Sequence, residues 1–154
     1  MSKLQAEIKQ TKPFSSIEEE VYLNLQRTAY QLKQQSEEIF KAANLSSTQY
    51  NVLRILRGAG ERGLASSQIS ERLVTKDSDI TRVSERLERR GLIKKERAED
   101  DKRVIVSKIT KKGLGLLEKL DGPTREKISG LLGHLGEDFL QQLNSLLVLA
   151  RSSK

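Results

Sequence analysis

The arginines and lysines between Arg54 and Lys112 are the residues whose chemistry is easiest to interpret. Residues 54–112 hold 17 Lys/Arg and 10 Asp/Glu, a surplus of seven, whereas the rest of the chain holds 11 of each. The formal net charge of +7 therefore belongs to this one segment. Cationic groups concentrated in this way can neutralise phosphates, so the distribution favours nucleic-acid binding over a generally solvated helical surface.

Arg103 is the strongest single candidate for a contact with DNA. It follows an acidic turn that lies between two β-rich runs. An arginine at the tip of a hairpin can enter a narrow minor groove, where the negative potential is enhanced. Asp101, two residues earlier, is expected to hold the guanidinium by a bidentate pair and to fix its direction. Lys102 and Arg97 are predicted to contact phosphates.

A second group of polar residues precedes the hairpin, on one side of an expected helix. Its apolar residues recur at the spacing of one helix face: Ile80, Val83 and Leu87. The opposite side carries the candidate DNA contacts Ser78, Asp79, Thr81, Arg82 and Arg86. Arg82 can contact a base or a phosphate, and Ser78 and Thr81 can donate to phosphates. Asp79 has two interpretations, as an acceptor from cytosine N4 or as a partner of the helix dipole.

These side chains need a helix and a hairpin in a fixed order to position them. Gly91 is expected to end the helix, because glycine tolerates positive φ. Two β-rich runs follow, residues 92–97 and 103–109, joined by the turn at residues 98–102. A helix followed by a hairpin with basic arms is the layout of a winged helix. Its helix can fill a DNA major groove while the hairpin, or wing, reaches an adjacent minor groove.

The segment before this recognition helix is expected to complete a helix-turn-helix. Residues 66–73 predict a helix that packs against the recognition helix, and residues 74–76 predict the turn between the two. Either Asp77 or Ser78 is expected to cap the recognition helix. Gly63-Leu64 is expected to form a very short strand that joins the wing.

Longer helices are expected on both sides of this module. Residues 1–12 are polar and are expected to be a poorly ordered segment or an arm. Residues 14–43 carry the apolar spacing of a long amphipathic helix. The next helix begins near Ser46, where Ser46 and Gln49 form a capping box.

The chain after the wing predicts two further helices. Thr110 is expected to cap the first, in which Gly122-Pro123 either introduces a kink or restarts the helix. A break at residues 133–136 precedes a last helix at residues 137–151, which is apolar over more than one face and needs a partner to cover the second. We therefore expect one domain, with dimerisation helices at residues 13–44 and 123–154.

The winged helix-turn-helix lobe is expected at residues 46–112, and its sequence resembles the MarR family of bacterial transcription regulators. Three pieces carry the resemblance, in order and at the right spacing. Arg86-Leu87-Glu88 with Gly91-Leu92 matches the end of the family's recognition helix, Asp101-Lys102-Arg103 matches its wing, and Ile109-Thr110 with Gly113 matches the closing element. The fold class expected is mainly α with a small antiparallel β wing.

The resemblance implies a homodimeric repressor or activator that binds palindromic double-stranded DNA and responds to a small, mostly aromatic effector. The amino-terminal residues lack an apolar signal-peptide core, so a cytoplasmic location is expected. An effector cleft would be lined by Tyr22, Tyr30, Phe40, Tyr50 and Arg54. Aromatic residues at helical spacing are more often core residues, and that interpretation is favoured here. A winged-helix protein–protein adaptor and a non-specific architectural DNA binder are the alternatives.

Several functional classes find no support in the 154 residues. The chain has no cysteine and one histidine, which argues against thiolate or histidine-rich metal sites and against a thiol switch. We find no nucleophile elbow, phosphate-cradling glycine motif or paired catalytic carboxylates, so no enzyme and no cofactor are expected. No apolar run reaches 18 residues, so no membrane association is expected.

Overall fold

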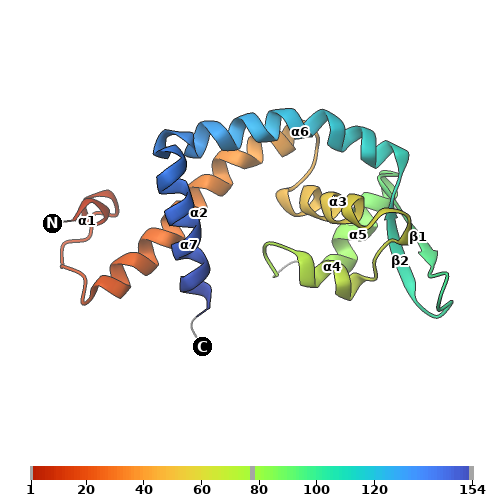
Figure 1. Cartoon of the computed structure of the whole chain (residues 1–154), viewed down its shortest axis with the longest axis horizontal. Coiled ribbons are helices and arrows are strands. Elements are labelled where there is room, and N and C mark those ends of the chain that lie inside the picture. Colours follow the sequence, from red (N-terminus) through yellow and green to blue (C-terminus); the bar gives the residue numbers. More distant parts are fainter. Residues whose placement is uncertain (1, 77–78, 153–154) are drawn as a thin grey trace. The chain divides into compact units, whose positions relative to one another are not determined.

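The computed structural model describes residues 2–76 and 79–152 (Figure 1). It divides into two compact units, Met1–Ser36 and Glu37–Lys154. The first unit contains a short helix, α1 (Lys3–Glu7), and most of the long helix α2 (Ile17–Ala42). The sequence predicted a poorly ordered segment or an arm at residues 1–12; the helix contradicts the first alternative, and an arm stays a prediction. Ser2 and Gln5 form a reciprocal capping box, and the Leu4 side chain is buried, so α1 is held in place.

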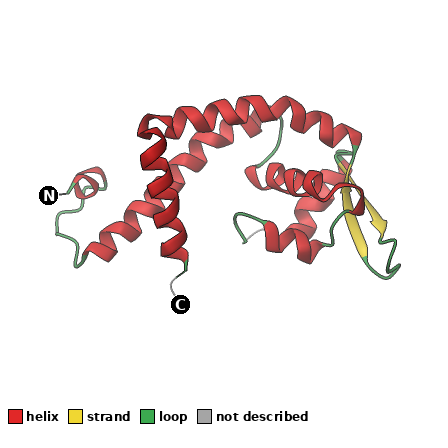
Figure 2. Cartoon of the chain, viewed as in Figure 1, coloured by secondary structure: helices red, strands yellow, loops and turns green. Residues whose placement is uncertain are grey.

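The second unit contains the end of α2 and all the remaining elements. Its further helices are α3 (Ser47–Ala59), α4 (Ser66–Arg72), α5 (Ile80–Arg89), α6 (Lys111–Leu132) and α7 (Gly136–Arg151), with 3₁₀ turns at Gly60–Arg62 and Gly133–Leu135. Strands β1 (Ile93–Arg97) and β2 (Ile105–Ile109) form the one sheet in the described part of the chain (Figure 2). The expected fold class, mainly α with a small antiparallel wing, is confirmed.

The wing is a two-stranded antiparallel hairpin whose register pairs Ile93 with Ile109 and Arg97 with Ile105. Leu64 and Ser107 exchange backbone hydrogen bonds of 3.0 and 2.8 Å, so the very short third strand predicted at Gly63-Leu64 is confirmed. This bridge fastens the middle of β2 to the segment that connects α3 and α4.

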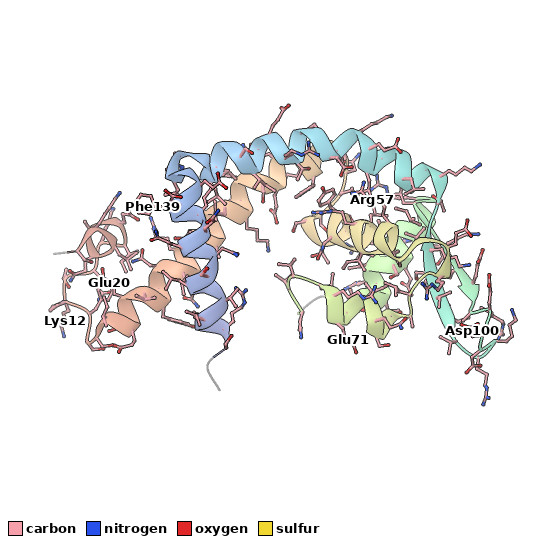
Figure 3. All side chains as sticks on the ribbon, in the orientation of Figure 1. Lys12, Glu20, Arg57, Glu71, Asp100 and Phe139 are labelled. Carbon is pink, nitrogen blue, oxygen red and sulfur yellow. The ribbon has the colours of Figure 1, made fainter. Side chains whose placement is uncertain are left out.

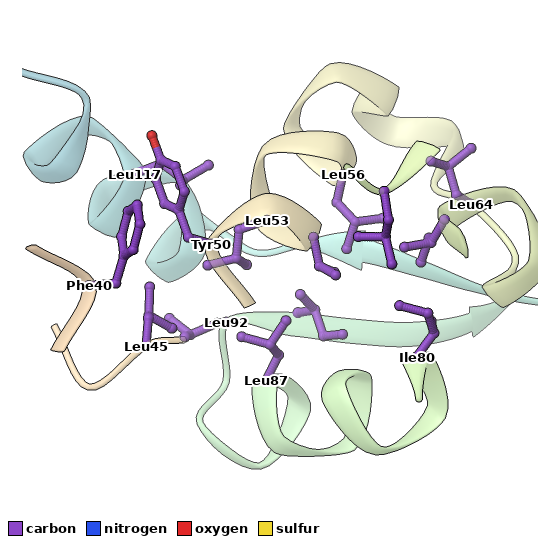
Figure 4. Close-up of a cluster of buried hydrophobic side chains, with 14 of the residues drawn as sticks. Phe40, Leu45, Tyr50, Leu53, Leu56, Leu64, Ile80, Leu87, Leu92 and Leu117 are labelled. Carbon is purple, nitrogen blue, oxygen red and sulfur yellow. The ribbon is translucent and has the colours of Figure 1, made fainter. Parts of the chain in front are cut away.

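A hydrophobic core lies between α3, α5, the wing and α6 (Figure 4). Its fully buried side chains include Leu53 and Leu56 from α3, Leu87 from α5 and Leu117 from α6. Ser46 and Gln49 form the predicted capping box at the start of α3, with bonds of 3.1 and 2.9 Å. The core therefore joins the recognition helix, the wing and α6 into one body.

The carboxyl end of α2 is closed by a Schellman motif, a pair of hydrogen bonds back into the last helical turn. The Leu45 amide donates to the Phe40 carbonyl at 2.8 Å, and the Asn44 amide donates to the Lys41 carbonyl at 2.9 Å. Asn44 takes the left-handed conformation that this motif requires, with φ 53°. Phe40 and Leu45 are both buried, which supplies the apolar contact that accompanies such an end.

Helix α6 begins where predicted, because the Thr110 side chain accepts from the Gly113 amide at 3.1 Å. A Cβ atom on Gly113 would lie 2.3 Å from the Leu92 carbonyl oxygen, so only glycine fits this approach. A restart at Pro123 was wrong, because α6 continues through it to Leu132. The buried Thr124 lies on the same face as Leu120, and this packed face holds the turn that contains the proline.

An ion pair connects α3 to α6, between Arg57, which is labelled in Figure 3, and Asp121. It is bidentate, with Nη1–Oδ2 at 2.7 Å and Nη2–Oδ1 at 3.2 Å. The hydrogen bond raises the pKa of the guanidinium and lowers the pKa of the carboxyl.

Within residues 2–76 and 79–152, no helix combines the length and the apolarity needed to cross a membrane.

Candidate nucleic-acid interface

The recognition helix α5 has the two faces that its sequence predicts. Ile80, Ser84 and Leu87 are buried, whereas Thr81, Arg82 and Arg86 are exposed. Three of the predicted DNA contacts therefore lie together on the solvent side of one helix. Ser78 lies outside the described residues.

Asp79 is the residue that caps α5. Its Oδ1 accepts from the Arg82 amide at 3.2 Å, so the prediction that Asp77 or Ser78 provides the cap was wrong. Ile80 is the first residue of α5 and is buried in the core, so the helix begins there. The residue before it, Asp79, therefore occupies the capping position. The carboxylate is thereby used by the helix itself, and a contact with cytosine stays a prediction.

Arg103 lies at the exposed end of the wing, and its side chain is 94% exposed. Asp101 Oδ1 accepts from the Arg103 amide at 3.0 Å and lies 3.5 Å from Nε. The bidentate pair expected between the two side chains was therefore wrong. A single carboxylate oxygen of Asp101 contacts both the Arg103 amide and the guanidinium Nε.

The other two predicted wing contacts are joined to each other. Arg97 Nη1 donates to the Lys102 carbonyl oxygen at 2.6 Å, across the turn that Asp100 marks in Figure 3. The Ala98 amide also donates to the Val104 carbonyl at 2.8 Å. The Arg97 guanidinium thus holds the turn in shape, and Lys102 is exposed.

Ion pairs along the strands neutralise part of the positive charge of the wing. Lys94 lies opposite Lys108 in the register, and Glu96 pairs with both ammonium groups, at 3.0 Å in the case of Lys108. Hydrogen bonds from Lys94 first, and then from Lys108, lower the pKa of the Glu96 carboxyl. The same carboxylate raises the pKa of Lys108. The cations of the two strands, Lys94 and Lys108, are therefore paired with Glu96, whereas Lys102 and Arg103 at the tip of the wing are exposed.

The five residues predicted to line an effector cleft fall into two groups. Phe40 and Tyr50 are buried and stacked, with ring centroids 4.4 Å apart, and the Arg54 guanidinium carbon lies 5.9 Å from the Tyr50 centroid. Tyr22 and Tyr30 belong to the first unit and are exposed. Stacking of Phe40 on Tyr50 agrees with the core interpretation of these two residues.

A solvent-open cleft of about 480 Å³ lies at the connection between α2 and α3. It is lined by Glu37, Lys41, Asn44, Leu45, Ser46 and Gln49. None of the five predicted residues lines it. A cleft at a connection between helices leaves no periodic aromatic pattern in the sequence, so the search for such a pattern could not find it. In the described part of the chain no group of three or more His, Cys, Asp or Glu residues is placed to hold a metal ion.

Arg90, the residue directly after α5, is a further cation of this lobe. Its guanidinium lies against the carbonyls that follow α2, with Nη1 2.5 Å from the Asn44 oxygen and Nη2 3.0 Å from the Ala43 oxygen. No sequence signal distinguishes it from Arg89, since the two are adjacent and alike.

The exposed polar face of α5 and the arginine-tipped wing define a winged-helix DNA-binding protein. The MarR family model matches residues 45–105. The HTH-type transcriptional repressor IacR of Pseudomonas putida is 32% identical over 114 residues, which cover 74% of this chain and 67% of the relative. The chain belongs to the MarR family and is a DNA-binding transcriptional regulator.

Two solved structures show the same architecture. A MarR transcription factor from Planctomyces limnophilus is 41% identical, with a TM-score of 0.67 over 89% of this chain and 99% of that chain. Sco3205, a MarR family regulator from Streptomyces coelicolor solved in complex with DNA, has the same fold with a TM-score of 0.79 at 18% identity, over 92% and 91% of the two chains.

Proposed function

We propose that this regulator is a repressor that acts as a homodimer on an inverted-repeat operator. The observation that carries the proposal is the apolar face of α7. Phe139, Leu143, Leu146 and Leu149 recur at the spacing of one helix face and are 66%, 38%, 62% and 67% exposed. A row of large apolar side chains in water is unfavourable, so a second copy is expected to cover it.

The first unit supports the same proposal independently. Ile17, Val21 and Leu25 recur every four residues along α2 and are also exposed. This row and the row on α7 occupy the two ends of the chain that the sequence assigns to dimerisation, residues 13–44 and 123–154. The lobe at residues 46–112 is then left to contact DNA.

In the proposed complex each copy inserts α5 into a major groove and its wing into the adjacent minor groove. Thr81, Arg82 and Arg86 face the bases and phosphates, and Arg103 enters the minor groove. Because the two copies are related by a two-fold axis, the operator is an inverted repeat. Its half-site centres are expected about 10–11 base pairs apart, one turn of B-DNA.

Two measurements test this function. Sedimentation of the full chain at micromolar concentration is expected to give a dimer. Selection from a pool of randomised duplexes is expected to return an inverted repeat. A monomer that binds one half-site tightly would contradict the proposal. Equal affinity for selected and random duplexes at two salt concentrations would favour an architectural binder, and no DNA binding at either would favour an adaptor.

We also infer that a small-molecule effector acts on the dimer, without any catalytic step, metal or cofactor. The cleft at the α2–α3 connection is the candidate site, because its volume of about 480 Å³ lies in the range of small-molecule sites and Lys41 lies in its lining. Benzoate and phenol are suitable probes of the expected aromatic class. Binding should raise the thermal midpoint of the wild type and should be weakened by Lys41→Ala.

Arg54→Ala is the matched variant for the effector test. Arg54 lies over the Tyr50 ring, outside the cleft lining. If Arg54→Ala abolishes the response and Lys41→Ala does not, the effector binds at the predicted aromatic residues and not in the cleft.

A further inference from the structure

Residues 90–92, directly after the recognition helix, are fastened to two other helices. The Arg90 side chain reaches the end of α2, as described above. The Arg90 carbonyl accepts from Lys112 Nζ at 2.7 Å, and the Thr110 hydroxyl lies 2.7 Å from the Gly91 carbonyl oxygen. Lys112 and Thr110 begin α6. One end of α5 is therefore connected to both long helices.

The α2 side of this connection depends on one guanidinium. The carbonyls of Ala43 and Asn44 follow the last turn of α2, where the helix dipole is negative and carbonyls lack partners within the helix. Asn44 holds its carbonyl there because it takes the left-handed position of the Schellman motif. Arg90 satisfies both oxygens with two different nitrogens. The fork of an arginine can do this, whereas the single ammonium of a lysine cannot hold the same planar geometry.

We propose that Arg90 is a positioning residue that sets the direction of the recognition helix relative to α2. The inference rests on the proposed homodimer, in which the long helices carry the two-fold contact. If α2 is held by the partner copy, a fixed link from α2 to α5 also fixes the distance between the two recognition helices. Arg90 then selects operator spacing without touching DNA.

The test compares Arg90→Lys with Arg89→Lys in the full-length protein. Both changes conserve charge, and Arg89 is the exposed neighbour on the same helix end. The probes are the best duplex that the wild type selects from a random pool and three derivatives, with one or two base pairs inserted or one removed between the half-sites. Affinities are measured at a temperature at which thermal melts show every variant to be folded.

We expect wild-type affinity to fall about tenfold or more on each altered spacing, comparable to the cost of a mismatched base pair. Arg90→Lys should bind the best duplex about tenfold more weakly, because a recognition helix that is less well held loses preorganisation. Relative to its own affinity for the best duplex, the affinity of Arg90→Lys for the altered spacings should fall by about threefold or less. Arg89→Lys should keep the wild-type spacing profile.

A wild-type spacing profile in Arg90→Lys would overturn the positioning role. If the affinity of Arg90→Gln falls equally at all spacings and its salt dependence drops by about one phosphate contact, Arg90 binds DNA directly and the inference is also overturned. If the lysine variant does not fold, Arg90→Gln takes its place in the test. The comparison still holds, because each spacing profile is a ratio of affinities measured with the same variant. A wild type without any spacing preference would instead contradict the proposed inverted-repeat operator, and the inference with it.

Discussion

The recognition helix and the wing both carry exposed arginines, but the two elements are held in different ways. Helix α5 buries Ile80 and Leu87 in the core and is tied at its end to α2 and α6. The wing tip is held by local bonds around its own turn, and the Arg103 side chain is 94% exposed. The buried side of α5 is therefore part of the folded core, whereas Thr81, Arg82 and Arg86 on its other side are exposed. Contacts from the wing can be altered while the fold is left intact.

The largest expected effect comes from the buried side of α5. Leu87 is fully buried, so Leu87→Ala should lower the free energy of unfolding by about 2–5 kcal/mol through lost apolar contact and a residual cavity. DNA binding should fall with it as the folded fraction drops. Urea unfolding measures the change.

Ser84→Ala is the matched control on the same face. The Ser84 hydroxyl is buried and has no hydrogen-bond partner among the described residues, so its removal should change stability by less than about 1 kcal/mol. A loss as large as that of Leu87→Ala would show that the buried face of α5 is more polar in solution than its packing indicates.

Arg103→Ala should show the opposite behaviour, with binding lost and stability kept. Operator affinity is expected to fall by about 1–3 kcal/mol, because a groove contact disappears. The thermal midpoint should stay within about 1 °C, since an exposed side chain outside the core contributes little to stability. Fluorescence anisotropy and thermal melts on the same samples distinguish the two effects. A shifted melting point would mean that the wing tip is not separable from the fold.

Asp101→Ala gives a smaller effect whose sign is informative. Removal of a negative charge near DNA should strengthen binding by simple electrostatics. Loss of the bonds to the Arg103 amide and Nε should instead weaken binding by roughly 1 kcal/mol. We expect weaker binding, measured by anisotropy at fixed salt, and tighter binding would rule out the orienting role of Asp101.

The smallest effect concerns the ion pairs at the base of the wing. Lys94, and then Lys108, hold the pKa of the Glu96 carboxyl below its ordinary value of 4.5. A carboxyl with a depressed pKa in the folded state stabilises the protein above its unfolded pKa, and this contribution disappears as the pH falls through the folded value. The Glu96 carboxyl should therefore titrate below 4.5 by NMR, and Lys94→Met should raise its pKa more than Lys108→Met does. An equal shift in both variants would contradict the order of the two causes.

Local patterns in the sequence predict much of the DNA-binding lobe. The capping box at Ser46 and Gln49, the end of α5 before Gly91 and the Thr110 cap are all confirmed. Gly91 has φ 68°, as a helix end of this type requires. These features depend on residues within about one turn of each other, so short-range propensities decide them. The buried and exposed faces of α5 follow in the same way from helical periodicity.

Other assignments depend on which neighbour a side chain meets after folding. Arg89 and Arg90 are adjacent and chemically alike, yet their directions on a helix differ by about 100°, and Arg90 is the one bonded to the carbonyls that end α2, 46 and 47 residues earlier in the chain. Phe40 and Tyr50 have the types expected of an effector site, but the fold stacks them in its core. The sequence by itself determined the order of the elements from α2 onward, the caps of α3 and α6 and the basic surface of the lobe. Tertiary packing alone decided which polar groups hold the recognition helix, because partners distant in sequence leave no local pattern.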